Sequence, residues 1–173
     1  MRVEAVAGLL SDHYDPRSKT VRLSEGVLRE RSAAAVAVAA HECGHAIQHA
    51  QAYAPLQWRS ALVGPVNLLN TLAMPMFIAG AVFQLFSLAL VAVVLFGATT
   101  LFHLVTLPVE FDASKRAIGI LDGSGIATPE EMVGVRKVLN AAGFTYLAAT
   151  LVSAAQLLYW LLQSGLLGGR SQD

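Results

Sequence analysis

Residues 41–45 form the sequence His-Glu-Cys-Gly-His, in which two side chains are spaced to bind one metal ion. Positions i and i+4 lie on the same face of a helix, so His41 and His45 can offer two imidazole nitrogens to a single ion. Glu42 stands beside the first histidine, where a carboxylate can take a proton from a metal-bound water. The run of small and β-branched residues at 33–40 favours a helix that packs closely on its neighbours.

The composition predicts a membrane protein. Of the 173 residues, 55% are hydrophobic and only 14% are charged, whereas soluble domains carry roughly 25% charged residues. Mean hydropathy is +0.55. A net charge of zero gives no general case for nucleic-acid binding. The single cysteine excludes an intrachain disulfide and is compatible with a reducing compartment.

Charge placement predicts three membrane spans. Residues 60–109 contain no Asp, Glu, Lys or Arg, which is enough for two crossings at about 20 residues each. Because backbone polar groups must be satisfied in lipid, we expect a helical hairpin, roughly 62–83 outward and 86–108 back. Pro65 and Pro75 are expected to mark the start of the first span and a kink in it. A second uncharged stretch, 138–169, predicts the third span.

The number of spans also predicts on which side each segment lies. Two crossings return the chain to the side that it left, so Glu110 emerges on the same side as the 41–45 helix. Eleven of the twelve Lys and Arg residues lie on that side, and only Arg170 lies across the membrane. By the positive-inside rule, the candidate metal site faces the cytosol.

Local signals predict a short N-terminal β element and two capped helices. Asp15 precedes a proline and marks a turn, and the alternation at Thr20–Ser24 indicates a strand. Ser32 is a predicted N-cap for the helix that carries residues 41–45. Thr128 and Glu131 form a predicted capping box. The helix that it opens is expected to continue into the last span.

Glu110 is the acidic residue best placed to complete the metal site. A catalytic zinc usually takes three protein ligands and leaves one position for water. Glu110 follows the hairpin directly, and a Glu at the mouth of a span is costly unless it has a partner such as a metal. We therefore predict His41, His45 and Glu110 as ligands of Zn²⁺, with zinc favoured by this ligand set.

The predicted fold class is mainly α. It is a helical membrane protein with an HExxH active-site helix, a transmembrane hairpin, a C-terminal transmembrane helix and a short N-terminal β element. We expect four segments: an N-terminal catalytic segment at 1–59, the transmembrane hairpin at 60–109, a third-ligand helix and cytosolic loop at 110–137, and the C-terminal transmembrane helix at 138–169.

Four segments together resemble the YugP-type membrane zinc metallopeptidases, which are related in mechanism to HtpX and the CAAX prenyl proteases. They are His13–Ser18, His41–His49, Leu107–Ser114 and Val138–Ala142. The resemblance implies a gluzincin-like site, with Glu42 as general base, in an integral protein of the bacterial plasma membrane. Members of this family usually begin with a further transmembrane helix, so we expect that the natural chain is longer.

One departure from the family pattern concerns the support of the ligands. Related gluzincins carry an Asp four residues after the ligand Glu, where it holds a ligand histidine. Ser114 occupies that position here, so we expect Ser114, Asp112 or a backbone carbonyl to orient the imidazole. The donor that stabilises the oxyanion in the transition state is left open. The candidates are His13, Tyr14, Arg116 and Asn140.

The resulting interpretation is a membrane-anchored zinc metalloendopeptidase. It would hydrolyse peptide bonds of membrane or membrane-adjacent proteins, with a protein or peptide substrate and the lipid bilayer as partners. The Thr20–Ser24 strand is a hypothetical pairing edge for an extended substrate.

Two alternatives remain open. A site-2-type intramembrane protease would take its third ligand from an Asp-Gly motif, for which Asp122 offers a match outside any predicted span. A catalytically inactive metal-binding scaffold would need the fold but not Glu42, so the presence of that carboxylate argues against it.

Overall fold

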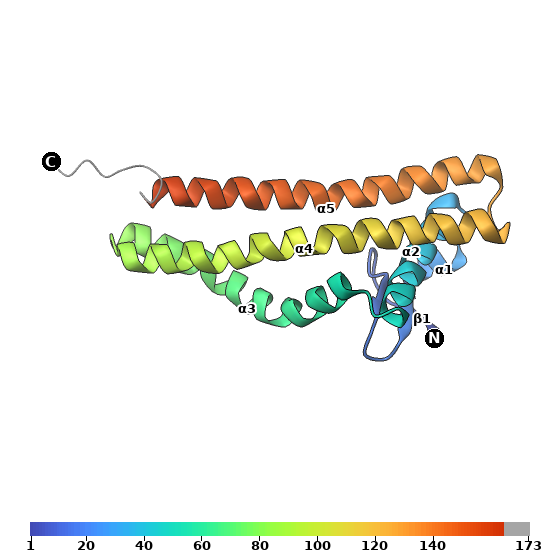
Figure 1. Cartoon of the computed structure of the whole chain (residues 1–173), viewed down its shortest axis with the longest axis horizontal. Coiled ribbons are helices and arrows are strands. Elements are labelled where there is room, and N and C mark those ends of the chain that lie inside the picture. The colour runs from blue at the N-terminus through green and yellow to red at the C-terminus, as the bar shows by residue number, and fades with distance from the viewer. Residues whose placement is uncertain (165–173) are drawn as a thin grey trace. The chain divides into compact units, whose positions relative to one another are not determined.

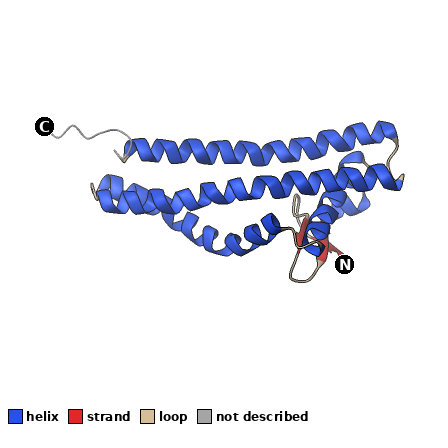
Figure 2. Ribbon diagram, viewed as in Figure 1, coloured by secondary structure: helices blue, strands red, loops and turns tan. Residues whose placement is uncertain are grey.

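The computed structural model describes residues 1–164 and is mainly helical, as predicted (Figures 1 and 2). The end of the predicted span at 138–169, together with Arg170, lies outside the described residues. In chain order the elements are β1 (Arg2–Val6), β2 (His13–Asp15), β3 (Thr20–Ser24), α1 (Glu25–Arg29), α2 (Ala33–Ala50), α3 (Ala54–Val82), α4 (Phe86–Ser124) and α5 (Pro129–Gln163).

Three helices, α3, α4 and α5, have the length and apolar composition needed to cross a membrane. The predicted hairpin turn falls at residues 83–85, between α3 and α4. Helix α3 already begins at Ala54, so it extends beyond the N-terminal end of the span predicted at 62–83. Both Pro65 and Pro75 lie inside α3, which transmembrane helices tolerate better than soluble ones.

The chain forms two compact units. Unit 1 contains Met1–Gln57 and Leu107–Thr145, and unit 2 contains Trp58–Thr106 and the described residues from Tyr146 onward. Both α4 and α5 therefore contribute residues to each unit. All four residues predicted to bind or activate the metal and its water belong to unit 1.

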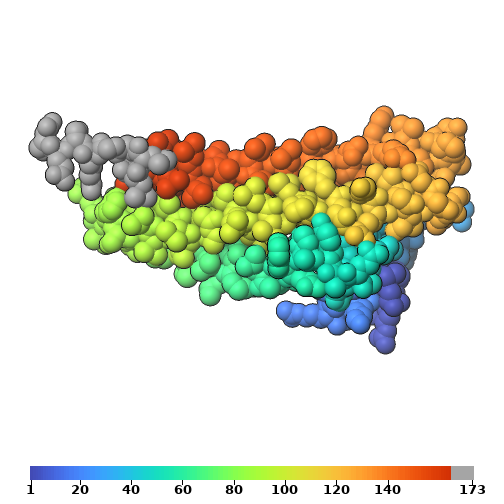
Figure 3. Space-filling model, in the orientation of Figure 1, coloured from blue at the N-terminus to red at the C-terminus, as the bar shows by residue number. Residues whose placement is uncertain are grey.

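Unit 1 contains a three-stranded sheet in the order β1-β3-β2, with β1 parallel and β2 antiparallel to β3. The strand predicted at Thr20–Ser24 is confirmed as β3, and its Val21 and Leu23 are buried. Because β3 has a neighbour on each side, the hypothesis that it pairs with an extended substrate is wrong. Strand addition would require an outer strand, such as β1, most of which is exposed in the dark-blue N-terminal segment (Figure 3).

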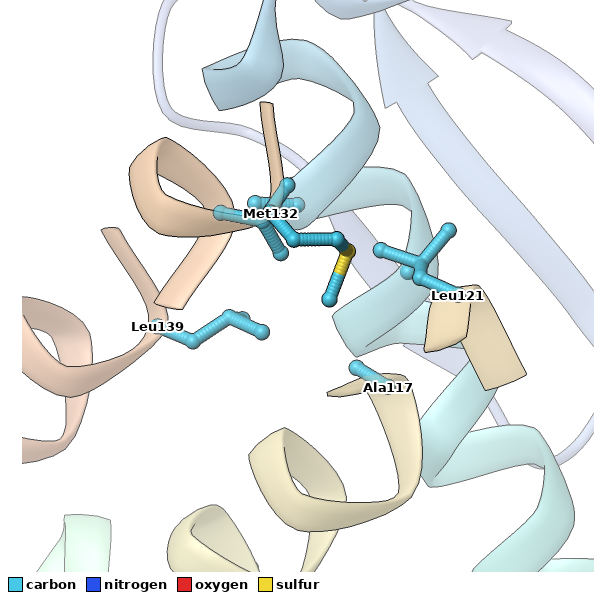
Figure 4. Close-up of a cluster of buried hydrophobic side chains, with 7 residues drawn as sticks. Ala117, Leu121, Met132 and Leu139 are labelled. Atoms are coloured by element: carbon cyan, nitrogen blue, oxygen red, sulfur yellow. The ribbon is translucent and has the colours of Figure 1, made fainter. Parts of the chain in front are cut away.

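The core of unit 1 lies where α2, α4 and α5 meet. Two alanines of α2 pack with buried residues of α4 and α5, and Figure 4 labels four residues of the latter two helices. The buried cluster consists of Ala37, Ala40, Ala117, Leu121, Met132, Val135 and Leu139. This packing fixes α2, which carries the two histidines, against α4, which carries Glu110.

Two predicted helix caps are confirmed. The Ser32 hydroxyl accepts a hydrogen bond from the Ala35 N–H at 3.2 Å and starts α2. At the start of α5, the Thr128 hydroxyl accepts from the Glu131 N–H at 3.2 Å, and the Glu131 carboxylate accepts from the Thr128 N–H at 2.8 Å. These contacts satisfy backbone donors that a helix start leaves open.

Unit 2 is packed mainly by apolar side chains. Trp160 is stacked on Phe77, with ring centroids 4.2 Å apart, and also contacts Phe96. Gly80 of α3 lies against α4 so closely that an added Cβ would be 2.6 Å from the Ala89 nitrogen. A close helix crossing therefore exists in this unit as well, without any candidate ligand beside it among the described residues.

Candidate metal centre

A glycine allows the two helices of the site to approach each other. Gly44 lies between the two histidines on α2, and a Cβ at this position would be 2.4 Å from the backbone oxygen of Ala113 on α4. No real side chain is accommodated at that distance without moving a helix. Gly44 therefore permits the histidine-bearing face of α2 to lie directly against the part of α4 that carries Glu110.

His41, His45 and Glu110 converge on one point. The Glu110 Oε2 atom lies 3.1 Å from His41 Nε2 and 3.7 Å from His45 Nε2. One possible ligand atom from each residue falls within 4.8 Å of the others. Donors that lie about 2.0–2.2 Å from a tetrahedral zinc ion stand roughly 3.3–3.6 Å apart. The two distances from Glu110 are close to this range, and the spread of up to 4.8 Å within the group would have to shorten on zinc binding.

Glu42 is buried beside this group, with 8% of its surface exposed. Burial raises the pKa of Glu42 above its ordinary value of 4.5, and the neighbouring histidines oppose this only in part. The backbone of Tyr14 in β2 also opposes the rise, as the smallest of these influences. A carboxylate with a raised pKa binds a proton more readily and can return it, which is what a general base in hydrolysis does.

His45 is charged more readily than an isolated histidine. Burial by itself would lower the pKa of His45, but the hydrogen bond and charge of Glu110 outweigh it. Gln48 and Glu42 act in the same direction as Glu110, so the pKa is raised.

Each histidine has a distinct partner on its second ring nitrogen. His41 Nδ1 lies 3.2 Å from the Ser114 hydroxyl, and His45 Nδ1 lies 2.9 Å from Gln48 Oε1. Asp112 does not take the expected direct position, since it accepts a hydrogen bond from Gln48 Nε2 at 2.8 Å. Sequence reasoning missed Gln48, although its position three residues after His45 puts both on one helix face.

The residues predicted as possible donors to the oxyanion of the transition state do not gather at one point. His13 donates to the Ser11 carbonyl oxygen at 2.7 Å, and Asn140 is exposed on α5. The Tyr14 hydroxyl lies 2.8 Å from His49 Nδ1 on α2. His49 therefore anchors β2 to the site helix, and it lies outside the group of possible ligands found among the described residues.

Arg116 and Asp122, two charged residues considered for the site, have their partners outside the group formed by His41, His45 and Glu110. The Arg116 Nε and Nη1 atoms donate to Asp112 and Gln51, each at 2.5 Å. Asp122 pairs with Arg136 at 2.5 Å, and nearly half of each side chain is exposed. Asp122 is not part of the group that could hold a metal in the described part of the chain, so the geometry favours Glu110 as the third ligand.

The chain belongs to the family described as "putative neutral zinc metallopeptidase", whose model matches residues 1–165. A relative from Bacillus subtilis (strain 168), "Putative membrane protease YugP", is 43% identical over 171 residues. The match covers 99% of this chain and 75% of the relative. No solved structure matches the chain.

Proposed function

We propose that the protein is a membrane-anchored zinc metalloendopeptidase that hydrolyses peptide bonds of membrane or membrane-adjacent proteins. His41, His45 and Glu110 are its zinc ligands, and Glu42 is its general base. The observation that carries the proposal is that three buried or nearly buried side chains converge as possible ligands. The carboxylate of Glu42 lies beside them and is not one of the three. Family membership and the printed name of the relative agree with it.

The residues of the site divide the work of hydrolysis. A zinc ion held by the three ligands would acidify a water and polarise the scissile carbonyl. The Glu42 carboxylate removes the proton of the attacking water, and the same group then delivers that proton to the leaving amine nitrogen. Neither Ser114 nor Gln48 takes part in proton transfer, since each occupies the outer nitrogen of a histidine.

The position of Glu110 supports a site at the membrane surface. It is the first charged residue after the uncharged residues 60–109. The excess of Lys and Arg in unit 1 supports a cytosolic location for this surface. Protein segments that emerge from the bilayer on that side are therefore the proposed substrate class.

The function is tested by comparing wild type with Glu42→Gln in detergent or in liposomes. The substitution keeps the shape of the side chain but removes its basicity. We expect hydrolysis of an unfolded protein such as casein to fall by about 10²–10⁴-fold, while bound zinc remains at the wild-type level. Equal hydrolysis by both proteins would contradict the role of Glu42.

A second function, a metal-binding membrane scaffold, predicts a different result. Wild type would then bind zinc without cleaving any unfolded or membrane-derived peptide. The buried Glu42 carboxylate argues against this function, because burial raises its pKa and so disfavours its charged form, a cost that a scaffold has no reason to bear.

A further inference from the structure

Gln48 is a fully buried polar residue to which the hydrolytic chemistry gives no task. It lies on α2, one turn beyond His45, and 0% of its surface is exposed. Its amide makes three hydrogen bonds within unit 1. His45 Nδ1 lies 2.9 Å from Oε1, and Nε2 donates to the Val109 carbonyl oxygen and to Asp112 Oδ2, each at 2.8 Å.

These contacts allow only one orientation of the Gln48 amide. A backbone carbonyl and a carboxylate are both acceptors, so the NH₂ group must face Val109 and Asp112. A flipped amide would direct its oxygen at two other oxygens. The Oε1 atom must therefore face His45, and only a protonated Nδ1 can donate to it.

The orientation of the amide determines which nitrogen of His45 remains free for a metal. When Nδ1 carries the proton of a neutral imidazole, Nε2 carries the lone pair. The Nε2 atom is the one that lies 3.7 Å from Glu110 Oε2. The required tautomer is thus set by Gln48, from the side of the ring opposite to the proposed metal.

Asp112 and Arg116 support the Gln48 amide on the side away from His45. Asp112 Oδ2 accepts from both Gln48 Nε2 and Arg116 Nε, and Arg116 also donates to Gln51. The Arg116 guanidinium lies over the Tyr53 ring at 5.7 Å from its centroid. The negative charge of Asp112 is therefore balanced on its outer side. The group that contacts His45 Nδ1 is therefore a neutral amide and not a carboxylate.

We propose that Gln48 is a positioning residue that fixes His45 as the Nδ1–H tautomer, and that Asp112 and Arg116 keep its amide in the orientation needed. The proposal rests on the proposed function only in taking His45 as a zinc ligand. Partners of this kind typically change metal affinity by about 10–100-fold when they are removed.

The first test measures zinc affinity by competition with a chromophoric chelator. Gln48→Ala should weaken zinc binding by about 10–100-fold. Gln57→Ala is the matched control, because Gln57 is exposed on α3, and it should bind zinc as wild type does. If wild type binds no zinc, the proposed function fails. If wild type and Q48A bind zinc equally, the positioning role alone fails.

A second variant separates positioning from general packing. Gln48→Met keeps a side chain of similar length but removes the acceptor that faces His45 Nδ1 and the donor that faces Val109 and Asp112. Its zinc affinity should fall by about 10–100-fold, as in Q48A. Wild-type zinc affinity in Q48M would overturn the proposal.

The tautomer can also be observed directly in wild type, which avoids any folding defect of a variant. The chain has five histidines, and ¹⁵N labelling of histidine distinguishes protonated from bare ring nitrogens by NMR. In zinc-free protein at alkaline pH, His45, assigned by its absence in His45→Gln, should carry its proton on Nδ1. A proton on Nε2 would overturn the proposal.

Discussion

The two units of the molecule bury polar side chains in different ways. The buried polar or charged side chains of unit 1 include an imidazole, carboxylates and an amide, whereas those described in unit 2 are hydroxyls. In unit 2, Thr106 and Thr150 donate to carbonyl oxygens one turn back in their own helices, each at 2.8 Å. A hydroxyl of this kind makes its hydrogen bond within its own helix, so it does not require a partner from a neighbouring helix.

The polar groups of unit 1 require partners from other elements. His45 depends on Glu110 of α4, and Gln48 depends on Val109 and Asp112 of the same helix. A buried amide or charge that loses its partner is strongly destabilising. Small displacements of α2 against α4 should therefore affect the site in unit 1 more than equal displacements affect unit 2.

The largest effect is expected from filling the helix crossings. Gly44→Ala would place a Cβ against the Ala113 backbone, and overpacking of this kind costs about 1–3 kcal/mol. If the strain is relieved by moving α2 away from Glu110, zinc affinity should fall by about 5–150-fold. Chelator competition measures this fall.

Gly80→Ala is the corresponding change in unit 2, where the Cβ would meet the Ala89 nitrogen. It should lower the thermal midpoint while the folded protein keeps wild-type zinc affinity. Gly119→Ala is the control on α4, since no atom lies within 4 Å of its added Cβ. A loss of zinc affinity in G80A equal to that in G44A would remove the contrast between the units.

A smaller effect is expected from two buried serines. Ser114→Ala removes the hydroxyl next to His41 Nδ1, and zinc affinity should fall by about tenfold, at the lower end for such partners. Ser153→Ala removes the hydroxyl that lies 2.9 Å from Thr100 in unit 2. That change should cost about 0.6 kcal/mol of stability and leave zinc affinity unaltered. Titration of each variant with zinc and thermal unfolding provide the two readouts, and a reversed pattern would contradict the account.

The smallest effect is expected in the pH dependence of the metal-free protein. The pKa values of Glu42 and His45 are both raised in the folded state, so the folded state binds more protons than the unfolded one. Stability must then fall as pH rises from the ordinary Glu value of 4.5 through the raised values. The thermal midpoint of zinc-free protein should decrease from mildly acidic to slightly alkaline pH, and less steeply in Glu42→Gln. A midpoint that rises over this range would contradict the two shifts.

Much of the fold could be predicted from local signals. The Ser32 cap, the capping box at Thr128, the strand at Thr20–Ser24 and the turn between α3 and α4 all depend on neighbouring residues, and all are confirmed. Strand β1 was not predicted, because its partner β3 lies at a distance in sequence. The early start of α3 was missed because Pro65 is tolerated inside it.

The candidate site was predictable to the same degree. The histidine spacing and the isolated Glu110 have sequence signatures, and the structure brings these residues together. Gly44 has no such signature and Gln48 only its helical spacing from His45, because each role depends on a contact between α2 and α4 that only the folded chain creates. Ser114 and Asp112 were both among the predicted partners of a ligand histidine. Ser114 contacts His41 directly, whereas Asp112 contacts Gln48, which in turn contacts His45.

The most direct measurement is the zinc content of purified wild type, Glu110→Ala and Asp122→Ala. We expect about one zinc per chain in wild type and in D122A, and a loss of most zinc in E110A. Full zinc content in E110A together with zinc loss in D122A would contradict the central claim. It would assign the third ligand to Asp122 and favour a site-2-type protease.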